Sequence, residues 1–499
     1  MSLETERAGR RVRLRLLCAI ACAGIVALAG SLSGCSLAPP YTAPPLPVEN
    51  AYPPDAPATS GTRGAADLAW RDYFASAALQ AMIADALEYN RDLRVAVLRV
   101  LDARAYYQIR RADQFPTVDA TGAEFGFRVP SDFSVTGNAR DENVYAVGGV
   151  ATWEIDFWGR VRSLKGAALD AFLGTDAARR AATVSLVAEV ANAYLSLREL
   201  DERSALARET VKTREESLRI FTRRFEVGTT TRLDVAQVET LLTEAQTIGA
   251  QLEQARAAQA HALALLLGTA EPSIADRANL EDTTIVEDLH VGLPSDLLVQ
   301  RPDVIAAEYR LKAANANIGA ARAAFFPNVT LTGFGGTASD ALSGLFDSGS
   351  RAWLYMPQLT LPIFDTGRRR ANLDLAEVRR DAAVADYERT VQSAFRDVAD
   401  ALSARYWLTE QVAIQRRALA AQQQRARLAQ LRYDAGSASY LEVLDAQRDL
   451  LGTAQSLVRY RRELLSSRVA LYAALGGGSL TYGESPPPNS RYSADTVTR

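Results

Sequence analysis

The sequence predicts a mainly α-helical chain with a small β part, built from two internal repeats. Proline is absent from Ser131 to Glu271 and from Ile363 to Ser485, and both stretches are rich in the helix formers Ala, Leu, Arg, Glu and Gln. Short segments that alternate with period two precede both stretches. The same landmarks recur in each half of the chain in one register. These observations indicate two copies of a unit in which a β-hairpin leads into a very long helix.

The first proline-free stretch carries apolar residues at helical spacing, as at Leu186, Val190 and Leu197. We predict a helix from about Ser163 to Glu226, which at 1.5 Å per residue would be on the order of 95 Å long. That length far exceeds an ordinary globular helix and suits an object that reaches across the periplasm.

Each long helix is predicted to end at a glycine-centred tip turn, at about residues 225–231 and 433–439. Gly228 and Gly436 supply the left-handed residue that commonly terminates a helix. The hydroxyl residues that follow, beginning with Thr229 and Ser437, can cap the next helix. Each turn therefore predicts a helical hairpin with a return helix.

Period-two alternation predicts two β-hairpins, at about residues 117–156 and 328–365. The alternating positions are Tyr145, Val147, Gly149, Ala151, Trp153 and Ile155 in the first, and Trp353, Tyr355, Leu359, Leu361 and Ile363 in the second. The partner strands are expected at Thr117 to Arg128 and Asn328 to Gly336. Strands of roughly ten residues are long enough to cross a bilayer at a tilt.

Matching landmarks set the domain layout. Phe115-Pro116 corresponds to Phe326-Pro327, and Asp156 to Asp365. We expect a lipoprotein signal peptide at 1–34, a proline-rich tether at 35–60, a first repeat at 61–270, a linker or equatorial region at 271–300, a second repeat at 301–478 and a flexible C-terminal tail at 479–499.

The N-terminus has the order of an export signal: an arginine-rich start, an apolar stretch from Leu16 to about Leu32, and small residues before Cys35. A cysteine at this place is where bacterial lipoproteins are cut and acylated, so we predict a lipid anchor on Cys35. Ser36 follows, and the absence of aspartate there favours the outer membrane. The alternative is a plain secretory signal with an incidental cysteine.

The remaining chain has no apolar run of membrane-spanning length, so any crossing of a bilayer must use β-strands. Four strands cannot close a membrane barrel, because the smallest have about eight. Oligomerisation is therefore expected, and the residues alone leave two or three copies open. The formal net charge of -3 gives no sign of a nucleic-acid partner.

Candidate catalytic chemistry is absent from the sequence. His261 and His290 lie in unrelated contexts without a second ligand nearby, so no metal site is expected. Once the signal has been removed, Cys35 is the one remaining cysteine. We find no phosphate-binding glycine loop or nucleophile elbow, so we expect neither an enzyme nor a cofactor.

Three runs of residues carry a resemblance to a known family. They are Leu293-Pro294-Ser295-Asp296-Leu297-Leu298-Val299-Gln300-Arg301-Pro302-Asp303-Val304, with its continuation to Phe326-Pro327; Tyr440-Leu441-Glu442-Val443-Leu444-Asp445-Ala446-Gln447-Arg448; and Tyr472 with Leu475-Gly476-Gly477-Gly478. In this combination the chain resembles the TolC-like outer-membrane efflux factors, in the OprM/NodT lipoprotein branch, along nearly its whole length.

The resemblance implies a TolC-like homotrimer, with a 12-stranded outer-membrane β-barrel (four strands per protomer) on a long periplasmic α-helical barrel. It implies two protein partners, a periplasmic adaptor (membrane fusion protein) and an inner-membrane transporter of the resistance-nodulation-division class. The chain would be the passive exit duct for small amphiphilic compounds. It would be held to outer-membrane lipid by N-palmitoyl and S-diacylglycerol groups on Cys35.

The resemblance also implies site residues. Leu441 and Asp445, with Arg448 one turn on, match the residues that line the periplasmic gate, and Glu442 matches an aspartate of TolC itself. The tip turns, at Gly228, Thr229, Gly436 and Ser437, are the expected docking places for the adaptor. The first repeat keeps the leucine as Leu233 but has Gln237 in place of the aspartate.

Other functions stay open at this point. Within transport, the alternatives are a TolC-type duct for protein secretion or for metal efflux, although Met82 and Met356 give no methionine-rich path. From another class comes a structural trimeric envelope lipoprotein. A purely structural tether needs no β-strands, so the duplicated hairpins argue against it.

Overall fold

The structure is a computed structural model of the 499-residue chain. It describes residues 37–49, 51–52, 64–133, 137–269, 280, 285, 289–292 and 294–481. The signal peptide, Cys35, part of the tether, most of the linker, Leu293 and the tail after residue 481 lie outside the described residues. What the sequence predicts for them stays a prediction.

The chain forms two compact units that do not coincide with the two repeats. The first unit comprises Met1–Pro44, Leu101–Leu173 and Glu308–Ala385, and the second comprises Pro45–Val100, Gly174–Ala307 and Asp386–Arg499. Each unit therefore draws segments from both repeats.

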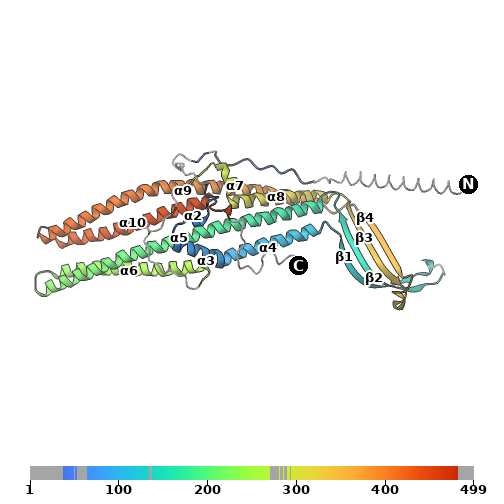
Figure 1. Cartoon of the computed structure of the whole chain (residues 1–499), viewed down its shortest axis with the longest axis horizontal. Helices are drawn as coiled ribbons and strands as arrows, with labels where there is room; N and C mark the ends of the chain where they lie inside the picture. The colour runs from blue at the N-terminus through green and yellow to red at the C-terminus, as the bar shows by residue number, and fades with distance from the viewer. Residues whose placement is uncertain are drawn as a thin grey trace. The chain divides into compact units, whose positions relative to one another are not determined.

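The first unit contains one antiparallel sheet with the strand order β1-β2-β3-β4 (Figure 1). Its strands are β1 (Thr117–Val129), β2 (Arg140–Ile155), β3 (Asn328–Ser339) and β4 (Arg351–Thr360). The short 3-10 turns η1 (Ser131–Phe133) and η4 (Leu342–Gly344) lie between the strands of each hairpin. The central β2–β3 ladder joins the two repeats, from Ile155 opposite Val329 to Tyr145 opposite Ser339. No strand residue is buried on either face in the single chain.

The strands differ from the predicted alternation at two ends. β2 begins at Arg140, five residues before the first predicted alternating position, Tyr145. β4 ends at Thr360, so Leu361 and Ile363 lie outside the strand in which they were predicted. The partner strand explains the early end, because β3 begins at Asn328, which pairs with Thr360, so the residues beyond Thr360 have no partner in the ladder.

Most of the chain is helical, as predicted. The helices are α2 (Trp70–Tyr73), α3 (Ala77–Tyr89), α4 (Arg91–Ala112), α5 (Arg160–Glu226), α6 (Arg232–Leu267), α7 (Leu297–Gln300, preceded by the 3-10 turn η3 at Pro294–Asp296), α8 (Pro302–Ala323), α9 (Arg368–Asp434) and α10 (Tyr440–Ala474). Both α5 and α9 have 67 residues. Among the described residues, no helix combines the length and apolar character that would let it cross a membrane.

The paired aspartate landmarks mark the beginnings of the two long helices. The carboxylate of Asp156 accepts hydrogen bonds from the backbone N–H groups of Val161 (3.1 Å) and Arg162 (2.8 Å). Asp365 accepts one from Arg369 at 3.1 Å. A carboxylate at this place satisfies N–H groups that have no partner within the helix. The first helix therefore begins at Arg160, slightly before the predicted Ser163.

In the second unit, the aromatic ring of Tyr472 packs parallel to that of Tyr73, with centroids 4.2 Å apart. The Tyr472 hydroxyl donates to the Leu68 carbonyl at 2.7 Å. A side chain at Gly477 would overlap the Tyr472 ring. The tyrosine and glycines of this signature run therefore have a structural role in closing the end of α10 onto α2.

Candidate functional site

The two tip turns end their long helices with the same hydrogen bonds. At the first, Gly228 has φ 77°, and the Thr229 N–H donates to the Arg224 carbonyl at 2.9 Å. At the second, Gly436 has φ 68°, and the Ser437 N–H donates to the Arg432 carbonyl, also at 2.9 Å. This pattern is the Schellman motif, in which a left-handed residue after the helix lets the next N–H reach back to a free carbonyl.

The hydroxyl groups of Thr229 and Ser437 donate to the same carbonyls, both at 3.0 Å. These two side chains therefore cap the C-terminal ends of α5 and α9. Neither hydroxyl caps the helix that follows, because both already donate to the helix that precedes the turn.

The return helices are capped differently from one another. Thr231 caps α6: its hydroxyl accepts from the Asp234 N–H at 3.2 Å, and the Asp234 carboxylate accepts from the Thr231 N–H at 2.9 Å. The Thr231 hydroxyl also donates to the Asp234 carboxylate at 2.6 Å, and this bond, followed by the one from the Thr231 N–H, lowers the pKa of Asp234. Ser439 stands at the same place before α10, and its side chain makes no cap bond. The prediction that hydroxyl residues cap both return helices is therefore wrong for the second repeat.

Glu442 faces the preceding helix. Its carboxylate pairs with Arg432 of α9 at 2.6 Å, and Arg432 is in the last turn of that helix. In the first repeat the corresponding acid, Asp234, is the capping residue. Because Glu442 is engaged by the arginine, no carboxylate returns to the backbone of Ser439 as in a capping box.

The structure brings Asp445 and Arg448 together and leaves Leu441 open. Asp445 pairs with Arg448 at 3.3 Å. Arg448 also lies 3.5 Å from Asp449, which pairs with Arg425 of α9 at 2.6 Å. The side chain of Leu441 has no buried environment in the single chain, since the residue is 48% exposed.

Arg425 and Asp449 are site residues that sequence reasoning missed. They connect α9 to α10 one turn beyond Asp445. Arg425, above all through its hydrogen bond, lowers the pKa of Asp449. A signal existed in the sequence, because the register of the helical hairpin about Gly436 places position 425 opposite position 449. It was missed because neither residue belongs to the run Tyr440 to Arg448 that carries the family resemblance.

The first repeat has uncharged residues at the positions that match Asp445 and Arg448, Gln237 and Thr240. Leu233 occupies the position of Leu441 and is 66% exposed. Gln237 is half-buried on α6. Both return helices therefore present a leucine in their first turn, and only α10 adds an aspartate and an arginine.

An aromatic cluster connects the two hairpins near their tips. The ring centroids of Phe221 and Tyr440 are 4.2 Å apart, and those of Tyr433 and Tyr440 are 4.8 Å apart. Phe221 also packs against Val235, Val238 and Leu444. Arg224 donates to the Tyr433 hydroxyl at 2.6 Å. Burial raises the pKa of Tyr440.

Farther along the bundle, buried ion pairs fasten α5 to α6 and α10. Asp201 pairs with Arg256 of α6 at 2.5 Å, and Glu199 pairs with Arg462 of α10 at 2.9 Å. Buried charges are tolerated only when they are paired in this way. The network supports the helices on which the tip residues stand.

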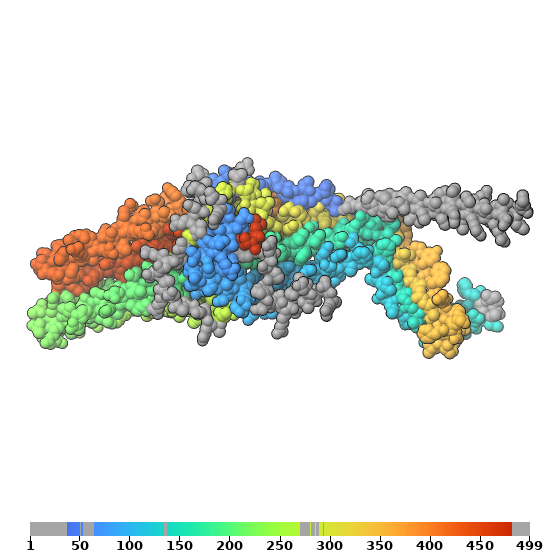
Figure 2. Space-filling view, in the orientation of Figure 1, coloured from blue at the N-terminus to red at the C-terminus, as the bar shows by residue number. Residues whose placement is uncertain are grey.

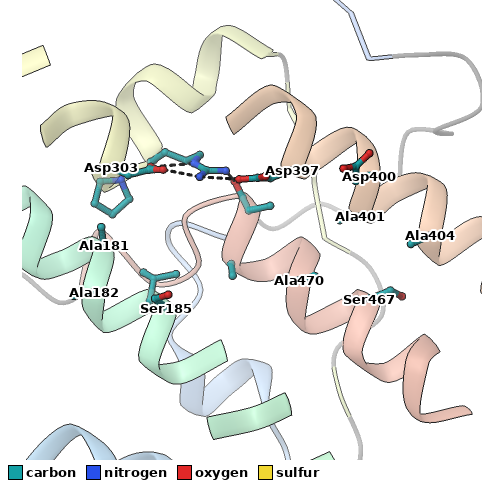
Figure 3. Close-up of a pocket in the computed structure, with 15 residues that line it drawn as sticks. Ala181, Ala182, Ser185, Asp303, Asp397, Asp400, Ala401, Ala404, Ser467 and Ala470 are labelled. Atoms are coloured by element: carbon teal, nitrogen blue, oxygen red, sulfur yellow. Dashed lines mark hydrogen bonds and ion pairs between the residues drawn. The ribbon is translucent and has the colours of Figure 1, made fainter. Parts of the chain in front are cut away.

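A cavity of about 700 Å³ lies in the second unit, between α5, α9 and α10 (Figure 3). Seven of its 15 lining residues are alanines, among them Ala181, Ala401 and Ala470, and Asp397 and Asp400 add carboxylates. Arg301 borders it and is 8% exposed.

Arg301 explains the Arg-Pro-Asp part of the family run. Its guanidinium pairs with Asp303 at 2.6 Å and with Asp397 at 3.2 Å. It also donates to the carbonyl of Ala474, at the C-terminus of α10, at 3.1 Å. A cation is favourable at a helix C-terminus. Arg301 therefore joins the start of α8 to α9 and α10, and it has no charge left unpaired for a ligand.

Among the described residues, no group of three or more His, Cys, Asp or Glu is arranged to hold a metal ion. Leucine and charged side chains project from the first turns of return helices whose backbone is fixed by glycine turns.

The family described as outer membrane efflux protein matches this chain over residues 82–269 and 293–477. The antibiotic efflux pump outer membrane protein ArpC of Pseudomonas putida is 43% identical over 470 residues, covering 93% of this chain and 96% of the relative. The outer membrane protein OprJ of Pseudomonas aeruginosa is 41% identical over 455 residues, covering 90% and 94%.

Solved structures agree with these sequence matches. The open state of the MtrE outer membrane channel of Neisseria gonorrhoeae superimposes with a TM-score of 0.81 at 39% identity. The alignment covers 89% of this chain and 98% of that channel.

Proposed function

This chain belongs to the outer membrane efflux protein family, and from that premise we propose that it is the passive exit duct of a tripartite efflux pump. The observation that carries this conclusion is the match to efflux-pump outer membrane proteins over nine-tenths of the chain. The resemblance predicted from the sequence is confirmed, and so is the TolC-like fold, mainly helical with four strands per chain. The protein is an outer-membrane channel.

The proposed substrates are small amphiphilic compounds. The relatives' names refer to antibiotic, solvent and toluene efflux, which supports this class. Channels of this family are efflux proteins, and we propose that this chain likewise catalyses no reaction. Energy would come from an inner-membrane transporter, and a periplasmic adaptor would bind the tip turns at Gly228 and Gly436.

Exposed edges and faces support a homotrimer. β1 and β4 each pair on one side only, so the sheet has two open edges. An open edge in lipid leaves backbone groups without partners. Three copies joined edge to edge would close a 12-stranded barrel, a size within the range of outer-membrane barrels.

The helix before β1 supports the same assembly. None of the 22 residues of α4 is buried, and its apolar Val95, Leu98 and Ile109 are 45%, 43% and 59% exposed. Because apolar helix faces are normally covered, α4 is a suitable contact for a neighbouring copy.

The gate proposal rests on Leu441, Asp445 and Arg448. In a trimer, the exposed leucines would form an apolar ring and the aspartates a charged ring at successive depths on the axis. Such rings narrow a path and select among ions. We further propose that Cys35 carries the lipid anchor.

An accumulation assay tests the function. Cells that lack the protein should retain several times more of a fluorescent amphiphilic dye than cells that contain it, and the wild-type chain should restore efflux. Equal accumulation, in cells whose protein is shown to be in the outer membrane beside its adaptor and transporter, would contradict an efflux role.

A further inference from the structure

Small side chains on three helices form much of the wall of the cavity in Figure 3. They include Ala181 of α5, Ala401 and Ala404 of α9, and Ala470 and Ala474 of α10. On α9 and α10 these residues are three or four positions apart, so each helix presents one alanine face to the cavity. Alanine ends at its Cβ, and such faces leave space that larger side chains would fill. The volume of about 700 Å³ is within the range of small-molecule sites, roughly 300–1,000 Å³.

Ion pairs set the spacing of the three helices. Arg301 pairs with Asp397 of α9 at 3.2 Å and donates to the Ala474 carbonyl of α10 at 3.1 Å. Farther along α10, Arg462 pairs with Glu199 of α5 at 2.9 Å. These bonds fasten α10 to both of its neighbours, and closing the helices over the cavity would strain them. The cavity is therefore largely preformed, as sites for small ligands usually are.

The charges around the cavity do not balance. Asp303 and Asp397 both pair with Arg301, at 2.6 and 3.2 Å. Asp400 makes no hydrogen bond within the described part of the chain, and its ion pair with Arg396 is long, at 3.7 Å. Arg396 also pairs with Asp397 at 3.2 Å. Two guanidinium groups therefore face three carboxylates, and the excess negative charge falls on Asp400, which Figure 3 shows outside the dashed network of Arg301.

An organic cation suits this cavity better than a metal ion. Asp303 and Asp397 are engaged by Arg301, and a divalent metal needs several oxygen ligands that converge on one point. No group of three or more His, Cys, Asp or Glu among the described residues is so arranged. An ammonium group needs only the one carboxylate of Asp400, and the alanine faces can cover an apolar body.

We propose that the cavity is a binding site for amphiphilic organic cations, with the cationic group at Asp400 and the apolar body against the alanine faces of α9 and α10. The site is separate from the gate proposed at the hairpin tips. It also goes beyond the exit-duct function, because binding requires neither an adaptor nor a transporter. The Asp400 side chain is 75% exposed, so its attraction is modest and the ligand can leave again, as conduction through a channel requires.

Fluorescence anisotropy of ethidium, a permanent organic cation, tests the proposal. The full channel is assembled in nanodiscs of phosphatidylcholine, which carries no net charge, and protein-free discs give the background. We expect saturable binding to the assembled channel. An absence of saturable binding would overturn the proposal, since it would show that the cavity has no affinity for the cation or is covered by a neighbouring copy.

Asp400→Asn tests the charge. Loss of a largely exposed ion pair should raise the Kd for ethidium up to about fivefold. High salt should weaken binding to the wild type, because it screens Asp400, and should change the Asp400→Asn channel little. Asp386→Asn is the matched control, because Asp386 is also on α9, is exposed, pairs with an arginine on its own helix and does not line the cavity. Equal Kd values for the two variants would overturn the role of Asp400.

Ala401→Leu with Ala470→Leu tests the volume. The two larger side chains fill the cavity, so ethidium should lose saturable binding. Ala413→Leu, at an exposed alanine of α9 outside the cavity, should bind ethidium as the wild type does. Size-exclusion chromatography shows whether each variant assembles, and Ala401→Leu alone replaces the double variant if that chain does not. Undiminished binding in an assembled, filled channel would overturn the proposal.

Cysteine protection locates the bound probe. Ser185 lines the cavity and is exposed, so ethidium should slow the reaction of Ser185→Cys with N-ethylmaleimide several-fold. Thr213→Cys is exposed on the same helix outside the cavity and should react at one rate with or without ethidium. The parent chain gives the background. An unprotected Ser185→Cys in a channel that binds ethidium would place the probe elsewhere and overturn the assigned site. The proposed efflux function would stand in that case, because the cell assay does not depend on this cavity.

Discussion

The two hairpin tips are built from matching positions of one repeat, and they hold their return helices in different ways. Both long helices end with a left-handed glycine and a backward-bonding hydroxyl, at Thr229 and at Ser437. The first return helix is then fixed locally by the capping box of Thr231 and Asp234. The second has no side-chain cap and is tied to α9 by Arg432–Glu442 and Arg425–Asp449.

The ion pairs indicate how the second tip can move. A capping box satisfies backbone groups that would otherwise lack partners, and it moves with its own helix. Exposed ion pairs contribute about 0–1 kcal/mol each and are screened by salt. The second return helix can therefore separate from α9 at low cost, and it is the helix that carries Leu441 and Asp445. Fastening by weak pairs at the proposed gate is consistent with a helix that must open.

The largest expected effect concerns the gate itself. Leu441→Ala with Asp445→Ala removes the proposed apolar and charged rings together, so the channel without its adaptor should conduct several-fold more in planar bilayers. The matched first-repeat variant, Leu233→Ala with Gln237→Ala, should have a smaller effect because it removes no charge.

Both gate variants must first be shown to be trimeric and inserted. Equal conductance of the two would abolish the functional distinction between the tips. An unchanged conductance in the Leu441→Ala/Asp445→Ala channel would place the gate elsewhere.

A capping comparison should give the next largest effect. Thr231→Ala removes a cap and should destabilise the first turn of α6 by about 1 kcal/mol. Ser439→Ala should change the stability of α10 very little, because its hydroxyl makes no cap bond. Hydrogen exchange of the amides in these two turns measures both. Equal losses of protection would mean that the second tip is capped in solution.

The cross-hairpin bond at Tyr433 gives a smaller effect. Tyr433→Phe removes the acceptor of the Arg224 hydrogen bond and should lower the free energy of unfolding by about 0.5–1.5 kcal/mol. Phe225→Tyr is the reciprocal change in the first repeat, at a side chain that is 40% exposed, and should be neutral. Denaturant unfolding of the solubilised protein compares the stabilities of the two variants. A loss of stability in the Phe225→Tyr chain would show that the added hydroxyl enters a buried environment.

The smallest effect is the response of two carboxylates to salt. The pKa values of Asp234 and Asp449 are both lowered in the folded chain. Each therefore contributes stability above the ordinary carboxyl pKa, and the contribution is lost as the pH falls through the lowered value. Salt should raise the pKa of Asp449 toward the ordinary range, because its partners are arginines.

Asp234 serves as the control for this titration, because neutral donors lower its pKa and salt should shift it little. Carbon-detected NMR titration at low and high salt can follow both groups. A salt-sensitive pKa at Asp234 together with a salt-insensitive pKa at Asp449 would contradict the inference that a capping box fixes the first tip and ion pairs fix the second.

Sequence patterns predicted the elements with strong local signals. Missing prolines and helical spacing located α5 and α9, and alternation located the four strands, because these signals depend on neighbouring residues alone. The end of β4 was missed, since apolar alternation continues through Ile363 while the partner strand begins only at Asn328, opposite Thr360. The extent of the partner strand decided where β4 ended.

The site was predictable in its residues and not in its contacts. Gly228 and Gly436 predicted the two tip turns directly. Whether a serine caps a helix depends on competing partners, and at Ser439 the neighbouring Glu442 is engaged by Arg432. The contacts of residues 37–41 with α8 were missed for a similar reason, because a proline-rich segment shows no apolar pattern. Two of these contacts use the backbone carbonyls of Pro39 and Leu37, which composition does not distinguish.

The ladder between β2 and β3 has a consequence for how the chain is made. Its partners belong to different repeats, so β2 stays without its second neighbour until the strand ending at Ser339 has been exported. Pairings between residues so distant in sequence form slowly, and unpaired strand edges invite aggregation. Until the second half of the chain arrives, β1 and β2 therefore form an unfinished sheet whose unpaired edge is prone to aggregation.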